Sequence, residues 1–253
     1  MKLRHVFMQI RDTFDDFQDT FNYNVEFINW YLSKAIRKLS IEIPYECNAI
    51  GICPTLIRNG RCAIIPVNCL SVEIVMSEEE KQMYLGLTHL RDKFEFYLSL
   101  FERGYRIANE SFDIPINTLL SLHEQFRRNN YRTEWDFKKV YIKESGINVI
   151  FRCKFTTYDF TLNMDVLEHK TKKMISSTMI WQTPPSYLSF YKDFKKVEIS
   201  EGKIIILDFL DKPHFEIETA SLTTCCPIVN YIYGNKIDEP ELIKKLRYND
   251  GQV

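Results

Sequence analysis

Apolar residues recur every three or four positions through the first 39 residues, which is the spacing of one face of an α-helix. The series is Leu3, Phe7, Ile10, Phe14, Phe17, Phe21, Val25, Ile28, Leu32, Ala35 and Leu39. It predicts a helix over residues 3–39. This helix is either unbroken or divided near Thr13, which would then be the N-cap of the second part.

A second long helix is predicted to begin at Ser77. Ser77 and Glu80 have the spacing of a capping box, and an apolar stripe follows from Met83 to Ala108. A third, shorter helix is predicted after Asp113, where Pro115 suits the first turn. Long apolar stripes pack most simply as an antiparallel pair. Residues 1–132 are therefore predicted to form a long-helix bundle with a Cys- and Pro-rich irregular insert at 40–76.

The apolar period changes from 3.6 to 2 at about Trp135, which is typical of β-strands. Ser145-Gly146 and Glu201-Gly202 each lie between two alternating segments and predict hairpin turns. Residues 133–237 are therefore predicted to form an antiparallel β-meander, interrupted at most by a short helix near 187–194. Residues 238–253 are predicted to form a short helix and a polar tail. The fold class predicted for the chain is α+β.

Composition and charge narrow the class of partner. The chain has 253 residues, with 33 Lys and Arg against 34 Asp and Glu. Nucleic-acid-binding domains usually carry a basic excess, so this balance does not indicate a nucleic-acid partner. No apolar run approaches the roughly 18 residues of a membrane helix. Arg11 and Asp12 interrupt the start of the chain before a signal-peptide core has formed, so we expect no secretory signal.

The cysteines indicate a reducing compartment. Seven cysteines, an odd number in a chain without an export signal, are typical of free thiols. We therefore expect a cytoplasmic protein, or one assembled into a particle that is built in the cytoplasm. Cys225-Cys226 are expected to be ordinary strand residues, with a strained vicinal disulfide as the alternative.

The motifs of common enzyme classes are missing from the sequence. The eight glycines are all at least nine positions apart, which excludes Gly-rich phosphate loops and the dinucleotide fingerprint in their standard forms. The five histidines are dispersed, and His89 and His123 fall on or beside apolar stripes, where we expect packing roles. We expect no cofactor and no small-molecule ligand.

One catalytic alternative is a metal-dependent nuclease. Asp159 and Glu168 would hold Mg²⁺, and Lys170 would orient a water or stabilise the transition state. However, the acid-x-Lys pattern occurs five times in this chain, and the segment between the two acids is short. The nuclease is therefore kept as the alternative hypothesis.

One metal alternative is a structural zinc site at Cys47, Cys53, Cys62 and Cys69. Structural zinc sites usually contain two thiols separated by two to four residues. Here five, eight and six residues intervene, which favours small buried thiols. The basic segment 127–132 is similarly expected to be a solvated helix end, with a nucleic-acid contact as the alternative.

These observations favour a non-catalytic structural or interaction protein, a subunit of a homo- or hetero-oligomeric assembly. The helical stripes exceed what one short core needs, so we expect them to continue across an interface with protein partners. The predicted interface residues are Phe14, Phe17, Phe21, Ile28, Leu32, Phe94, Tyr97 and Phe101. Phage and virion connectors share this architecture by analogy only. A small binding module such as an immunity protein or antitoxin is a further alternative.

Overall fold

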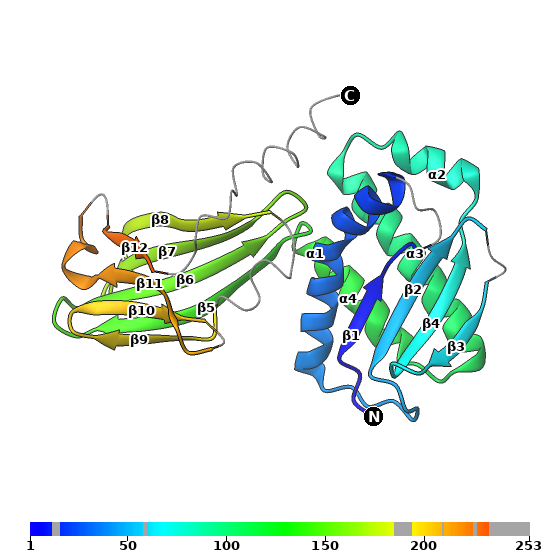
Figure 1. Ribbon diagram of the computed structural model, residues 1–253, viewed down its shortest axis with the longest axis horizontal. Coiled ribbons are helices and arrows are strands. Elements are labelled where there is room, and N and C mark those ends of the chain that lie inside the picture. The colour runs from blue at the N-terminus through cyan, green and yellow to red at the C-terminus, as the bar shows by residue number, and fades with distance from the viewer. Residues whose placement is uncertain (12–15, 58–59, 185–193, 209, 225–226, 233–253) are drawn as a thin grey trace. The chain divides into compact units, whose positions relative to one another are not determined.

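The computed structural model describes residues 1–11, 16–57, 60–184, 194–208, 210–224 and 227–232. The chain divides into two compact units, Met1–Arg132 and Thr133–Val253. In the described residues these units contain four α-helices and three four-stranded sheets, which is a mixed α+β fold (Figure 1). Each unit is considered in turn.

The first unit is a mixed sheet with helices packed against it. The strands are β1 (His5–Met8), β2 (Ala49–Thr55), β3 (Cys62–Ile65) and β4 (Cys69–Val75), arranged in the order β1-β2-β4-β3. β1, β2 and β4 are parallel, and β3 pairs antiparallel with β4. The helices are α1 (Asp16–Leu39), α2 (Glu78–Leu85), α3 (Leu90–Ser111) and α4 (Ile116–Arg128). The predicted long-helix bundle is therefore wrong.

The helix predicted over residues 3–39 is wrong in its first part. Residues 5–8 form β1, and Val6, Met8 and Ile10 are buried at every second position. The sequence predicted a helix here because the apolar residues Leu3, Phe7 and Ile10 are spaced by four and three positions, as on one helix face. The chain here instead buries Val6, Met8 and Ile10. The predicted break near Thr13 lies outside the described residues.

The predicted irregular insert at 40–76 is also wrong, because three of the four strands lie in it. Parallel strands that are buried on both faces show nearly continuous apolar runs, so the alternation that marks a strand is weak. In β2, all residues except Cys53 are buried.

The capping box predicted at Ser77 is confirmed. The Ser77 side chain accepts a hydrogen bond from the Glu80 N–H, and the Glu80 carboxylate accepts one from the Ser77 N–H. The helix ends at Leu85, however, and α3 starts at Leu90, so the long helix predicted from Ser77 is two helices. In α3, Gly104 allows the backbone to approach β2: a Cβ there would lie 2.5 Å from Ile52 Cδ1.

Helix α1 closes the outer edge of β1 with polar side chains. Asn22, Asn29 and Ser33 lie seven and four residues apart, on one face of the helix. Asn29 and Ser33 each bond both the N–H and the C=O of one β1 residue, which are Met8 and Val6 respectively. Asn22 bonds both groups of Ile10, two residues after the strand. This edge therefore has no free backbone groups at these positions for another strand to bind.

The second unit consists of two antiparallel sheets. One contains β5 (Thr133–Ile142), β6 (Ile147–Phe155), β7 (Phe160–Glu168) and β8 (Met174–Thr183) in sequence order. The other contains β9 (Lys196–Ser200), β10 (Lys203–Leu207), β11 (Pro213–Glu218) and β12 (Val229–Tyr231), also in sequence order. All pairings are antiparallel, as the change of period predicts.

Both predicted hairpin turns are confirmed, since Gly146 and Gly202 adopt positive φ angles of 66° and 73° between paired strands. Aromatic rings join the two sheets. The ring centroids of Trp181 in β8 and Phe215 in β11 are 6.0 Å apart, and the Phe194 ring stacks on the rings of Phe160 and Phe215. The helix predicted near 187–194 lies outside the described residues, except for Phe194. The short helix and tail predicted at 238–253 also lie outside them.

Candidate functional site

The nuclease residues do not form a site. Asp159 lies just before β7 and Glu168 is the last residue of that strand, so about 30 Å of extended chain separates them. Asp159 accepts hydrogen bonds from Thr156 and Gln182, whereas Glu168 accepts one from Thr171. Lys170 is at the Glu168 end. Two carboxylates this far apart cannot hold one Mg²⁺ ion, so Asp159, Glu168 and Lys170 do not form the metal site of the nuclease alternative.

The four cysteines of the zinc alternative do not converge either. The described residues contain no group of three or more His, Cys, Asp or Glu side chains that could hold a metal ion. Cys47, Cys53, Cys62 and Cys69 are all free thiols. Burial raises the pKa of Cys69 to about 11, so this thiol stays protonated at neutral pH. Cys225 and Cys226 lie outside the described residues.

The residues predicted to form an interface are core residues. Phe17, Phe21, Ile28, Leu32, Phe94, Tyr97 and Phe101 are all buried within the first unit, and Phe14 lies outside the described residues. Phe21 packs edge-on against Tyr97, with ring centroids 5.0 Å apart, which joins α1 to α3. The stripes of the two helices therefore cover each other and the sheet, and they are not available at the surface.

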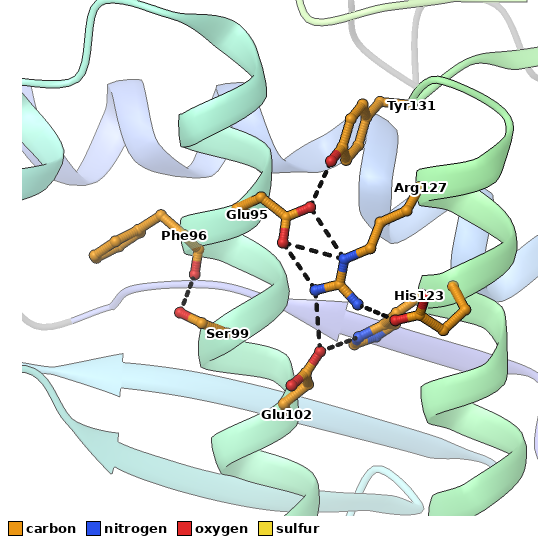
Figure 2. A network of polar contacts seen from close by, with 8 residues as sticks. Glu95, Phe96, Ser99, Glu102, His123, Arg127 and Tyr131 are labelled. Atoms are coloured by element: carbon orange, nitrogen blue, oxygen red, sulfur yellow. Dashed lines mark hydrogen bonds and ion pairs between the residues drawn. The ribbon is translucent and has the colours of Figure 1, made fainter.

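The densest cluster of charged side chains joins α3 to α4 (Figure 2). Arg127 donates from Nε to both carboxylate oxygens of Glu95, at 3.0 and 3.1 Å, and from Nη2 at 2.9 Å. It also bonds Glu102 at 3.2 Å and Glu124 at 2.6 Å. The Tyr131 hydroxyl donates to Glu95. Arg127 is thus neutralised by acids, so segment 127–132 is not the uniformly basic surface that a nucleic-acid contact would need.

The pKa values in this cluster favour a fixed ionisation state. Burial alone would raise the pKa of Glu95, but the hydrogen bonds from Arg127 and Tyr131 outweigh it and hold the pKa below its usual value. His123 is fully buried beside Glu102, as its predicted packing role requires, and burial lowers its pKa. The network resembles a structural clamp between two helices more than a reactive centre, because nearly every charged group already has a partner.

A different candidate appears when the edges of the three sheets are compared. Five of the six edge strands in the described residues are covered by a helix, have four residues or fewer, or contain charged residues, and each of these features opposes pairing with another chain. β1 is covered by α1, β3 has four residues followed by Pro66, and β12 has three residues. β5 contains four charged residues, and β9 contains Lys196 and Glu198.

Strand β8 is the exception. It has ten residues, Met-Ile-Ser-Ser-Thr-Met-Ile-Trp-Gln-Thr, with no charge, no Pro and no Gly. Within the described part of its unit, its backbone pairs only with β7. Met174, Ile175 and Met179 are exposed large apolar side chains. Two bulges, at Ile175 and Ile180, bound a regular stretch from Ser176 to Met179.

Sequence reasoning located this strand but missed its significance. An alternating segment from Met174 to Trp181 is visible in the sequence, and so is its lack of charge. That it is the last strand of its sheet is a property of the strand order, which only the structure gives. Low charge over a long strand is the one sequence signal that points to it.

Comparison with known proteins gives no further assignment: no family model, no curated protein and no solved structure matches this chain. None of the described helices is long and apolar enough to cross a membrane.

Proposed function

We propose that this protein is a non-catalytic interaction protein that enters an assembly by adding a strand to β8, at the edge that is unpaired in the described residues. The observation that carries this proposal is the contrast between β8 and the other five edges. A connector-like particle component and a binding module of the immunity or antitoxin type are both forms of this function, and they differ in the partner.

The chemistry of an open edge supports the proposal. An edge strand presents unpaired N–H and C=O groups, and an added strand satisfies them with backbone hydrogen bonds. The exposed side chains of Met174, Ile175 and Met179 offer apolar surface beside those bonds. Long uncharged edges promote aggregation, and natural proteins usually guard them. β8 has two bulges, but in the described residues it has neither a charge nor a second paired strand, which supports a surface with a partner.

The test uses a charge placed on the edge. Met179→Lys introduces a lysine at a side chain that is 55% exposed, so the fold should tolerate it while strand addition is opposed. Ile199→Lys is the matched control, because Ile199 is 51% exposed on the charged edge strand β9. Met174→Lys provides a second edge variant.

The full-length proteins are compared by amine cross-linking in their native cells, followed by mass spectrometry. We expect Lys170, Lys172 and Lys173, which flank β8, to cross-link to one discrete protein partner, whether another protein or a second copy. That product should be lost in both edge variants and kept in Ile199→Lys. Retention of the product formed by Lys170, Lys172 and Lys173 in both edge variants would overturn the proposal.

A further inference from the structure

We infer that the strand that pairs with β8 belongs to a different protein and carries, at every second position, an apolar side chain, a hydrogen-bond donor and a second apolar side chain. This inference rests on the proposed function and names the chemistry of its partner. It is argued from the side chains that β8 presents on one face of its sheet.

The pairing with β7 shows which side chains of β8 share a face. Met174, Ser177 and Met179 lie opposite every second residue of β7, namely Leu167, Asp165 and Asn163. Side chains at alternate positions of a strand lie on one face, so these three side chains of β8 do as well. The bulge at Ile175 takes up the additional residue between Met174 and Ser177. We expect an added strand to keep the spacing of β7, with one side chain opposite each of the three.

This face points away from the second sheet of the unit. Ser176 and Trp181 lie opposite the other set of alternate residues of β7, and therefore on the other face. On that face the Ser176 hydroxyl donates to the C=O of Leu222 at 3.4 Å, and the Trp181 ring packs against Phe215. A partner that covers the first face therefore does not compete with the second sheet.

The two methionines favour apolar side chains on the partner. Met174 is 47% exposed and Met179 is 55% exposed. Directly opposite side chains in an antiparallel pair have Cβ atoms about 4.5–5.5 Å apart, so an apolar side chain there would cover each methionine. A charged side chain at the same position would lose water without gaining a partner.

Ser177 requires a hydrogen-bond donor on the partner. Its hydroxyl donates to the carboxylate of Asp165 at 2.6 Å, and Asp165 is 3% exposed and forms an ion pair of 3.1 Å with Arg152. Because the Ser177 proton is used in this bond, the Ser177 oxygen can only accept from a partner. Ser or Thr on the added strand can donate to it, whereas Asp or Glu would set a second negative charge beside Asp165.

The same bond disfavours a second copy of this chain as the partner. In an antiparallel pair centred on Ser177, the two serines would lie opposite each other, and each would already donate to its own Asp165. Neither serine could then donate to the other. The partner is therefore a different protein, whose central side chain is not already used as a donor.

Peptides of about nine residues test this pattern on the full-length protein. Each peptide has Val at two positions four apart and Thr elsewhere, and the residue midway between the two Val is Thr, Val or Glu. Fluorescence anisotropy of the labelled peptides measures the dissociation constants. Thr and Val have nearly the same shape, so one hydrogen bond separates them. We expect the Thr-centred peptide to bind about fivefold more tightly than the Val-centred one, and the Glu-centred peptide to bind most weakly.

Variants of the protein assign the preference to one oxygen. Ser177→Ala should remove the preference for Thr over Val. Thr178→Ala is the matched control and should keep this preference, because Thr178 lies opposite Met164, on the other face of the same strand. Met179→Lys should weaken the binding of all three peptides, and Ile199→Lys should leave it unchanged.

Four results would overturn this inference: equal affinity of the wild type for the Thr- and Val-centred peptides, a preference that Ser177→Ala retains, no binding of any peptide, and a cross-linked partner that is a second copy of this chain. If no peptide binds but the cross-linked product is lost in both edge variants, this inference fails and the proposed function stands. If no peptide binds and both edge variants keep that product, both fail.

Discussion

At the scale of single residues, the buried histidine of the first unit links stability to pH. His123 is fully buried between α3 and α4, and burial lowers its pKa from 6.5. The unfolded chain therefore takes up this proton at a higher pH than the folded chain does. Stability from this group is complete above about pH 6.5 and is lost as the pH falls toward the lower pKa of the folded state.

We expect the wild-type protein to have a lower denaturant midpoint at pH 5.5 than at pH 7.5, and His123→Gln to show a smaller difference. His89→Gln is the control, because His89 is exposed at the N-cap of α3 and makes no capping hydrogen bond through its side chain. Urea unfolding followed by circular dichroism measures both midpoints. A pH difference that His123→Gln leaves unchanged would contradict the assignment.

The roles of single residues were predicted unevenly from the sequence. The packing role of His123 was predicted correctly, because a histidine on an apolar helical stripe is usually buried. The packing role predicted for His89 is wrong, since His89 precedes the first turn of α3 and is exposed. The partners of Arg127 were not predicted. Glu95 and Arg127 are 32 positions apart, and their contact depends on how α3 and α4 pack together.

At the scale of elements, the contact between α1 and β1 depends on side chains that replace a neighbouring strand. Asn29 accepts from the Met8 N–H at 2.8 Å and donates to the Met8 C=O at 3.1 Å. Asn29→Leu leaves both backbone groups without these partners in a partly buried site. We expect a loss of about 2–3 kcal/mol in the free energy of unfolding.

Asn24→Leu is the matched control, since it makes the same substitution on the same helix and removes one long contact of 3.4 Å to the Tyr84 hydroxyl. Its expected cost is less than about 1 kcal/mol. Equilibrium urea unfolding of the two variants measures the difference. Equal losses for both would show that the hydrogen bonds to β1 do not determine the stability of this edge.

The elements themselves were predicted best where one periodicity persists over many residues. The stripe of α3 and the alternation of β6 and β7 each produce a clear pattern, and these elements are present. Other strands show no distinctive period in the sequence. β1 and β3 have only four residues each, and β2 is buried on both faces. The parallel pairing of β1 with β2 connects residues that α1 separates in the sequence.

At the scale of the whole molecule, the chain carries nearly equal numbers of basic and acidic residues. With 33 basic and 34 acidic residues, two copies repel each other little at long range. Local charges at a contact can then decide whether copies associate. The sequence predicted an interaction protein, but it placed the interface on helical stripes that the core uses, because burial within a unit and burial between units produce the same pattern.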